Sequence, residues 1–292
     1  MTMTSNLTFA GNVKRIMEGN TRVTGKEQYY TPPSVARAIF ERFLEKHPDV
    51  PRHVFLEPAG GNGVFLDLAK NLGFEQIVSV DIEPKHSDVQ FGDFLDTTFD
   101  FAGGICITNP PFGRNNALSI PFFNHAAKFC DYIVFIVPKS WHKWSVINRL
   151  DKRFHLTDSW DLSIDYLDDR GFASHGAGNL KTIVQVWERR PYERNKIEVP
   201  DHGLITKTTP EESDVSLTIF GYGCGTVRTE FPRRKNTTQM FLKLNHPKAL
   251  EALQSVDFSR FYLNTAYTEA LSIKEINFLL NEYLGLENPK LN

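Results

Sequence analysis

The sequence contains little cysteine, no long apolar run and no excess of positive charge. The three cysteines, Cys106, Cys130 and Cys224, are far apart and show no CxxC spacing, which argues against a disulfide framework or a zinc site and predicts buried thiols. No apolar run approaches about 18 residues, and the first residues lack the charged-then-apolar pattern of a signal peptide, so we expect a soluble, cytoplasmic protein with no membrane partner. The formal net charge is −2, so a nucleic-acid partner would require a local basic patch.

Common ligand fingerprints are also absent. The stretch "AGGNG" at 59–63 lacks the GxGxxG spacing of a dinucleotide site and the Lys-Ser/Thr pair of a P-loop, which disfavours a phosphate-rich ligand. His142 and His175 have no partners at metal-ligand spacing, so we interpret them as ordinary polar residues and expect no metal.

Strand-like and helix-like segments alternate through the first two thirds of the chain. With 292 residues, of which 41% are hydrophobic, the chain can bury a full core and form one large domain and a smaller one. Apolar spacing predicts helices at 34–46 and 64–72 and strands at 53–58, 77–84, 89–94, 103–108, 132–138 and 181–190. Because strands and helices alternate, we expect a doubly wound, Rossmann-like α/β sheet.

The alternation of strand-like and helix-like segments ends near Pro191. Turn clusters such as "KTTPEE" and "GYGCG" follow, with a basic run at 233–235 and a helix-like segment closed by Gly285. We therefore expect a catalytic domain at 1–190 and a second, smaller α+β domain at 191–292.

Polar residues stand at the ends of two of the predicted strands. Asp81 ends the second strand, where a carboxylate can accept both hydroxyls of a ribose. Asp93 follows the next strand and could accept a hydrogen bond from an exocyclic amine, with Phe94 beside a purine. Taken singly, Asp81 could be an N-cap and Asp93 a turn residue. Together with the glycine turn, they favour a nucleoside ligand.

The fourth predicted strand ends in "TNPPFG". Two consecutive prolines can neither continue a strand ladder nor begin an ordinary helical turn, so they hold the neighbouring Asn109 and Phe112 rigidly at the end of this strand. Such rigidity predicts that a ligand lies against this motif.

Five segments occur in a characteristic order: "YYTPPSVARAIF", "LEPAGGNGVFL", "VDIEP", "GDFLD" and "TNPPFG". This order resembles that of the gamma-class amino-methyltransferases of DNA, which use S-adenosylmethionine to methylate adenine N6. The resemblance covers residues 26–190. It implies S-adenosylmethionine as cofactor, double-stranded DNA of a restriction-modification setting as partner, and a target-recognition domain after residue 190.

The resemblance also implies roles for individual residues. The arm "YTP" would close over the methionine part of the cofactor, the turn after the first strand would line it, and the two aspartates would take its ribose and adenine. The implied cofactor-binding residues are Tyr30, Thr31, Pro32, Glu57, Ala59, Gly61, Asp81, Ile82, Asp93 and Phe94.

The catalytic motif is then Asn109, Pro110, Pro111 and Phe112. An exocyclic amine is a poor nucleophile because its lone pair is delocalised into the ring. If the Asn109 side-chain oxygen and the Pro110 carbonyl each accept one N–H, the nitrogen can aim its lone pair at a sulfonium methyl group. Phe112 would stack on the base. No Pro-Cys pair occurs, so the thiol nucleophile needed for carbon methylation of cytosine is missing.

A base inside a duplex must be flipped out before its amine can react, so further stacking and phosphate contacts are expected. We nominate Phe172 at the pocket rim, with a hairpin core residue as the alternative, and Lys139 near the substrate channel. Trp141 and Trp144 could line that channel or simply pack. The densest basic run, Arg233, Arg234 and Lys235, is the expected phosphate contact, with a solvated loop as the alternative.

Other functions stay open from the sequence. The same motif could act on guanine N2 or adenine in RNA, on cytosine N4, or on a protein glutamine. A nonenzymatic protein that keeps the fold as an interaction module is a third possibility. The intact set of strand-end residues favours an enzyme, and the leading "YYTPP" with a trailing domain favours DNA.

Overall fold

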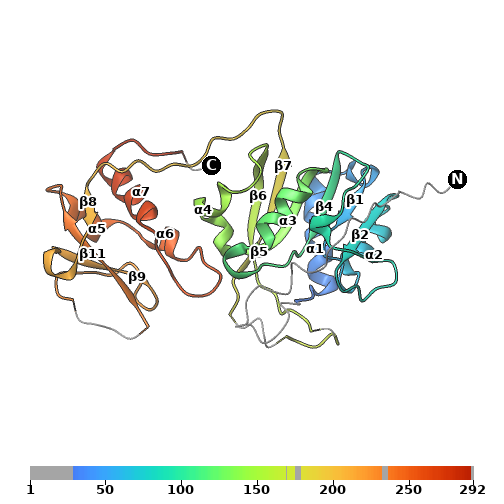
Figure 1. Ribbon diagram of the computed structural model, residues 1–292, viewed down its shortest axis with the longest axis horizontal. Helices are drawn as coiled ribbons and strands as arrows, with labels where there is room; N and C mark the ends of the chain where they lie inside the picture. The colour runs from blue at the N-terminus through green and yellow to red at the C-terminus, as the bar shows by residue number, and fades with distance from the viewer. Residues whose placement is uncertain (1–28, 169, 175–178, 232–235, 291–292) are drawn as a thin grey trace. The chain divides into compact units, whose positions relative to one another are not determined.

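The computed structural model describes residues 29–168, 170–174, 179–231 and 236–290. The chain divides into two compact units (Figure 1). Unit 1 comprises Met1–Pro138 and Arg149–Asn195, and unit 2 comprises Lys139–Asn148 and Lys196–Asn292. The short segment Lys139–Asn148 thus groups with the C-terminal part of the chain, although its position in the sequence is within the expected first domain.

Unit 1 is built on a seven-stranded sheet in the order β3-β2-β1-β4-β5-β7-β6. Neighbouring strands from β3 to β5 are parallel, and β7 runs antiparallel to both β5 and β6. Its strands are β1 Phe55–Glu57, β2 Ile77–Asp81, β3 Gln90–Phe91, β4 Gly104–Thr108, β5 Cys130–Pro138, β6 Phe154–Leu162 and β7 Thr182–Arg189. The expected doubly wound α/β sheet is confirmed, and β6 is a strand that the sequence pattern did not predict.

Helices cover both faces of this sheet. They are α1 Pro33–Lys46, α2 Val64–Asn71 and α3 Ser119–Ala126. α1 begins with Pro33 at its first position, where a missing N–H costs nothing, and it buries Ile39 and Phe40 in a core shared with α2 and the strands. On the other face, Phe123 of α3 packs edge-on against Phe135 and Trp187. The central strands are therefore buried on both sides.

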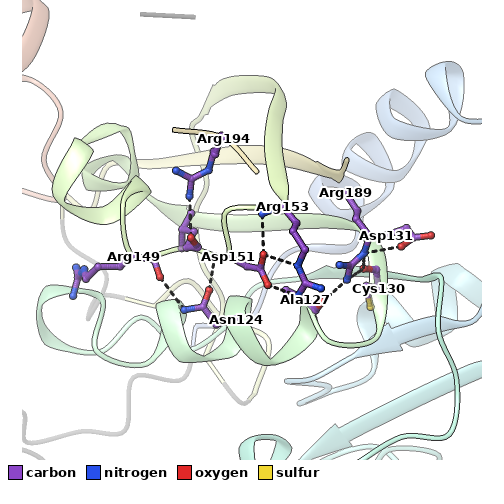
Figure 2. A network of polar contacts seen from close by, with 10 residues as sticks. Asn124, Ala127, Cys130, Asp131, Arg149, Asp151, Arg153, Arg189 and Arg194 are labelled. Carbon is purple, nitrogen blue, oxygen red and sulfur yellow. Dashed lines mark hydrogen bonds and ion pairs between the residues drawn. The ribbon is translucent and has the colours of Figure 1, made fainter. Parts of the chain in front are cut away.

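A polar network closes the edge of the sheet where β5 begins and β7 ends (Figure 2). The Arg189 guanidinium donates to Asp131 at 2.9 Å and to the carbonyls of Ala127 and Cys130, which lie just after α3. A cation beside these carbonyls satisfies acceptors that the end of a helix leaves unpaired. This network has a structural role, and it lies at the edge opposite to the carboxyl ends of the parallel strands.

Unit 2 contains a four-stranded antiparallel sheet in the order β10-β9-β11-β8. Its strands are β8 Ile205–Lys207, β9 Val215–Phe220, β10 Val227–Arg228 and β11 Thr238–Leu244, and its helices are α4 Trp144–Ile147, α5 Ala249–Ser255, α6 Ser259–Tyr262 and α7 Ile273–Leu284. Gly285 ends α7 in the left-handed conformation, as the sequence predicts. Short 3-10 turns complete the chain: η2 Val50–Arg52, η3 Phe94–Asp96, η4 Arg114–Asn116, η5 Lys139–His142 and η7 Pro210–Glu212.

The segment after β5 is held in unit 2 by packing and charge. The Trp144 ring contacts Phe261 and Phe278, and the Lys143 ammonium pairs with the buried Glu275 carboxylate at 2.9 Å. Trp141 is 0% exposed and Trp144 7% exposed. The suggestion that these two tryptophans form a wall along a substrate channel is therefore wrong, and the packing alternative is correct.

The sequence also led to expectations about cysteines, metal ions and membrane-spanning helices. All three cysteines are free and buried, as expected, and burial raises the pKa of the Cys224 thiol to about 11. Within the described ranges, no three His, Cys, Asp or Glu side chains are arranged to hold a metal ion. No helix in those ranges is both long enough and apolar enough to cross a membrane.

Candidate functional site

The candidate site lies where the strand order of unit 1 reverses. β1 pairs with β2 on one side and with β4 on the other, so the chain winds away from this point in two directions. In open α/β sheets, ligands bind outside the carboxyl ends of the strands at such a switch point. Glu57 ends β1, Asp81 ends β2, and Asn109 directly follows β4. The structure therefore brings three of the predicted residues to one edge.

The glycine turn is fastened to this edge by Asp81. One carboxylate oxygen of Asp81 accepts the Gly61 N–H at 2.8 Å, and the other accepts the Glu83 N–H at 2.7 Å. Gly61 and Gly63 have φ of +47° and +80°, which a side chain would strain. Asp81 caps no helix in the described chain, so the N-cap alternative is wrong. Its oxygens keep lone pairs that can accept further donors.

Asp93 caps a local turn with one of its carboxylate oxygens, and its other oxygen is left to accept a hydrogen bond from a ligand. Its Oδ1 accepts the Leu95 N–H at 2.9 Å and so caps the short η3 helix, as the turn alternative predicts. Its Oδ2 makes no hydrogen bond with the residues that the structure describes. The turn role therefore does not compete with acceptance of an amine by the second oxygen.

Glu57 is a buried carboxyl group without a proper partner. It is 1% exposed, and neither oxygen has a partner in hydrogen-bonding geometry among the described residues. Burial raises the pKa of this carboxyl well above its ordinary value; the nearby Leu66 N–H and the Ser79 hydroxyl oppose the rise, and the charge of Asp81 adds to it. A group with these properties is costly for folding alone, which is typical of a functional site.

Other orphaned polar atoms belong to the same region. Buried side-chain oxygens usually have a hydrogen-bond partner. Together with Glu57, four residues here depart from that rule within the described chain: Thr31, Ser79, Thr108 and Asn109. Thr108 ends β4 and Asn109 follows it, Ser79 lies within β2, and Thr31 belongs to the arm described below. These oxygens would be satisfied by a ligand rich in N–H and O–H donors. S-adenosylmethionine, with its ammonium, ribose hydroxyls and adenine amine, fits that requirement.

The segment Tyr29–Pro32, here called the arm, connects three parts of the site. The Tyr29 carbonyl accepts the Asn109 Nδ2–H at 2.8 Å. The Tyr30 ring lies against Gly61, where an added Cβ would approach its Cε1 to 3.1 Å. The Tyr30 backbone also pairs with Leu167, at 3.1 and 2.9 Å. The arm therefore links the Asn-Pro-Pro-Phe motif, the glycine turn and the loop that carries Phe172.

The hydrogen bond to Tyr29 fixes the direction of the Asn109 amide. Since the Nδ2 donates to a carbonyl, the Oδ1 is the atom left over, and it is buried without a partner in the described chain. This free acceptor stands on the rigid Pro-Pro motif. The sequence could not reveal the contribution of Tyr29, because the contact is made by a backbone atom eighty residues away in the chain.

The loop after the motif is tightly closed. The Phe112 carbonyl accepts the N–H groups of Leu118 and Ser119 at 3.2 and 3.3 Å. Asn115 and Asn116 both have positive φ, of 55° and 61°, a conformation that asparagine tolerates better than most residues. Phe112 itself is 7% exposed, and Pro110 is buried, so the motif is fixed by its surroundings as well as by its prolines.

One predicted contact lies in the core. Phe94 is 1% exposed, and its ring packs against Phe122 and His125, so in this structure it presents almost no surface to a purine. Two other apolar side chains at this end of the sheet are open: the predicted Ile82, 50% exposed, and Phe91, 62% exposed. Phe91 is the register partner of Asp81 and was missed by sequence reasoning. The sequence feature that could have revealed Phe91 is an aromatic residue placed in a strand too short to bury its side chain.

The predicted nucleic-acid contacts fall into three groups. Phe172 is 68% exposed on a turn held by Asp168, which rules out the hairpin-core alternative. Lys139 is half-buried at the start of the segment that groups with unit 2. The basic run at 233–235 lies outside the described residues. Of the remaining residues that the sequence predicts at the cofactor site, Ala59 and Pro32 are half-buried.

Comparisons with known proteins add the following. No family model matches this chain. A provisionally assigned RNA methyltransferase from Pyrococcus horikoshii is similar at 21% identity, with a TM-score of 0.44 and coverage of 56% of this chain and 87% of that chain. A Thermoplasma acidophilum protein is similar at 18% identity, TM-score 0.41, with 57% and 92% covered. A provisionally assigned class I S-adenosylmethionine-dependent methyltransferase from Listeria monocytogenes is similar at 14% identity, TM-score 0.41, with 57% and 62% covered.

The first prediction concerns the effect of the buried Glu57 carboxyl on the free energy of unfolding. Because its pKa is raised in the folded state, the folded protein binds more protons than the unfolded chain once the pH exceeds about 4.5, and stability is lost as the pH rises through the folded pKa. Glu57→Gln removes that loss. The variant should be more stable than the parent at neutral and alkaline pH, by about 1 kcal/mol or more, and the difference should vanish in acid. Urea unfolding across a pH series measures this.

The matched control is Glu45→Gln, a change at an exposed position on α1. It should alter the free energy of unfolding by less than about 0.5 kcal/mol at every pH. If Glu57→Gln shows the same pH dependence as the parent protein, the Glu57 carboxyl is not held neutral by burial.

Proposed function

We propose that this protein is an S-adenosylmethionine-dependent methyltransferase that acts on the exocyclic N6 amine of adenine in DNA. The observation that carries the proposal is the Asn109 Oδ1, a buried acceptor without a partner in the described chain, fixed in direction by Tyr29 and standing at the switch point of the sheet. An amine brought to this point finds an oriented oxygen for one of its N–H bonds.

The cofactor site is assigned from the orphaned atoms around it. Glu57 and Thr31 would take the methionine part, since an ammonium group supplies the partner that the Glu57 carboxylate lacks. Asp81 would accept the ribose hydroxyls, and the free Oδ2 of Asp93 the adenine amine. Ile82 and Phe91 would offer the apolar surface for the ring. When bound, S-adenosylmethionine supplies the methyl group as an electrophile.

The catalytic work of the chain is to orient and polarise the amine. If Asn109 Oδ1 accepts one N–H and the Pro110 carbonyl the other, the nitrogen lone pair is withdrawn from the ring and directed outward. The acceptors must not move, and the Pro-Pro pair, the Phe112 carbonyl hydrogen bonds and Tyr29 all restrict them. Asn109 is neutral, so it stabilises developing positive charge without removing a proton. That proton can leave to water after transfer.

The DNA substrate is the finer part of the proposal. It is supported by the order of the sequence segments, by a second compact unit after the sheet unit, and by an exposed aromatic, Phe172, on the loop that pairs with the arm. RNA amines, cytosine N4 and protein glutamine are the alternatives. Incubation with deuterated S-adenosylmethionine and separate pools of DNA, RNA and protein, followed by mass spectrometry of the nucleosides and peptides, distinguishes them. Labelled N6-methyladenine should appear in the DNA pool.

The second prediction concerns Asn109. Asn109→Ala removes an acceptor that matters most in the transition state, so the methylation rate at saturating substrates should fall about 100-fold or more. Cofactor affinity measured by calorimetry should change little, because Asn109 is not assigned to the cofactor. A variant that methylates at the parental rate would exclude Asn109 from catalysis.

The third prediction concerns the arm. Tyr30→Ala removes the ring that rests on Gly61 and should loosen the arm, so that Tyr29 no longer fixes the Asn109 amide. The rate at saturating cofactor should therefore fall in the parent background but fall no further in the Asn109→Ala background, because both changes remove the same oriented acceptor. Tyr30→Phe keeps the ring and serves as the control. Fully additive losses would mean that the arm acts independently of Asn109.

The fourth prediction concerns Phe172. A flipped base loses its stacking neighbours, and an aromatic face offsets about 1–3 kcal/mol of that cost. Phe172→Ala should therefore weaken duplex DNA binding by roughly 5- to 100-fold without a comparable loss of cofactor affinity. The defect should be smaller when the target adenine is mispaired, because extrusion then costs less.

Fluorescence of 2-aminopurine at the target position reports base opening directly. Tyr192→Ala, a change at another exposed aromatic of unit 1, is the control and should leave DNA affinity unaltered. Equal behaviour of the Phe172 and Tyr192 variants would remove Phe172 from the DNA interface.

A further inference from the structure

A turn between β6 and β7 holds Phe172 by its backbone. The Asp168 N–H donates to the Phe172 carbonyl at 2.7 Å, and the Phe172 N–H donates to the Asp168 Oδ1 at 3.0 Å. The same Oδ1 accepts the Arg170 N–H at 2.9 Å, and Gly171 supplies the φ of +83° that the turn requires. A single residue, Asp168, therefore binds both backbone polar groups of Phe172.

The Asp168 side chain holds this turn as a carboxylate. The hydrogen bond from the Phe172 N–H lowers the pKa of the Asp168 carboxyl; desolvation opposes the fall, and the Arg170 guanidinium, 3.1 Å from Oδ2, adds to it. A charged acceptor makes stronger hydrogen bonds than a neutral one. The Arg170 side chain is exposed, and exposed ion pairs contribute little, so the bonds from Asp168 to the backbone are the ones that hold the turn.

The residue before Asp168 is bonded to the arm. The Leu167 N–H donates to the Tyr30 carbonyl at 2.9 Å, and the Leu167 carbonyl accepts the Tyr30 N–H at 3.1 Å. Tyr29, the neighbour of Tyr30, accepts the Asn109 Nδ2–H at 2.8 Å. Every step from Asp168 to the Asn109 amide is therefore a peptide bond or a hydrogen bond.

A second set of contacts runs beside this path. Leu167 forms an antiparallel bridge with Ala173, and the Ser174 N–H donates to the Tyr166 carbonyl at 2.6 Å. The Tyr166 side chain is buried, and its ring centroid lies 5.4 Å from that of Tyr29. The residues before the turn thus pair with the arm on one side and with the residues after the turn on the other. A change in the turn would therefore displace the arm as well.

The two ends of the path have complementary tasks in the proposed reaction. Phe172 would contact the face of the target base, and the Asn109 Oδ1 would accept a hydrogen bond from the amine at the edge of that base. The face and the edge of a base are rigidly related, so both contacts form together only if the two protein groups keep a fixed relation. A misplacement of about 1 Å is enough to lower the rate strongly.

We propose that Asp168 is a positioning residue for methyl transfer, which fixes Phe172 relative to the Asn109 acceptor. It acts through the backbone pair of Leu167 and Tyr30 and does not touch the reacting atoms. The inference rests on the proposed function, because it takes an amine held by Asn109 as the group that is methylated.

The test compares variants of the full chain in methylation of DNA at saturating cofactor and DNA. Asp168→Ala removes the acceptor of the Phe172 N–H, so kcat should fall on the order of tenfold, while the affinity for S-adenosylmethionine in calorimetry stays at the parental value. Asp168→Asn keeps an oxygen that can accept the same N–H groups and should restore most of the rate. Asp201→Ala removes a carboxylate that accepts the Gly203 N–H at 2.9 Å in a turn of unit 2; it is the matched control and should have no effect.

Two further readouts separate positioning from a merely structural role. Hydrogen exchange at the amides of Tyr30 and Leu167 should be faster in Asp168→Ala than in the control, because their pairing is loosened. In the Asn109→Ala background, Asp168→Ala should lower kcat by about twofold or less, because the acceptor that it positions is already absent.

The failures are distinguishable. Parental kcat in Asp168→Ala, a loss of rate that is fully additive with Asn109→Ala, or no recovery in Asp168→Asn would each overturn the positioning role while the proposed function stands. A loss of rate without faster exchange in the arm would overturn it as well, because Asp168 would then act by another route. If the parent protein does not methylate DNA at all, the proposed function fails, and the positioning role fails with it.

Discussion

The site depends on one hydrogen bond, from the Asn109 amide nitrogen to the carbonyl of Tyr29. A primary amide can be turned over with little change in shape, so its oxygen is useful only if something holds the nitrogen. Prolines fix the backbone of the motif but not the side-chain torsions of Asn109. The arm supplies that missing constraint, and because its next residue rests on Gly61, the orientation of the amide is tied to the state of the glycine turn.

Unpaired buried polar atoms at this same edge of the sheet lower the stability of unit 1. Each buried polar atom without a partner costs about 1–3 kcal/mol, and several such atoms meet here. The network around Arg189 at the opposite edge shows the contrast: there the carbonyls of Ala127 and Cys130 are satisfied within the chain. The unpaired acceptors that gather at the carboxyl ends of the parallel strands form an arrangement that a ligand would complete.

The fold was largely predictable from the sequence, and the site only in part. Alternating apolar runs are a local signal, so the parallel strands could be found. The carboxylate at the end of the second strand pointed to Asp81, the Pro-Pro motif pointed to Asn109, and Glu57 came from the family resemblance alone. β6 was missed because its residues are mostly half-buried and lack a clean alternation. The burial of Phe94 and the grouping of 139–148 with unit 2 depend on contacts with distant segments, which no local pattern encodes.

The charge of the chain bears on how DNA would be held. Binding to phosphates gains free energy by releasing counterions, in proportion to the number of cations that are free to contact the backbone. Several basic side chains already have acidic partners, as in the pairs Arg42–Asp158, Lys70–Asp88, Arg153–Asp151 and Arg260–Glu282. Because the net charge is also −2, nonspecific electrostatic binding to DNA phosphates would be weak. Contacts by exposed rings lose little strength in salt, so a nearly neutral protein that acts on DNA needs stacking surfaces for much of its affinity. The 68% exposure of Phe172 fits that need.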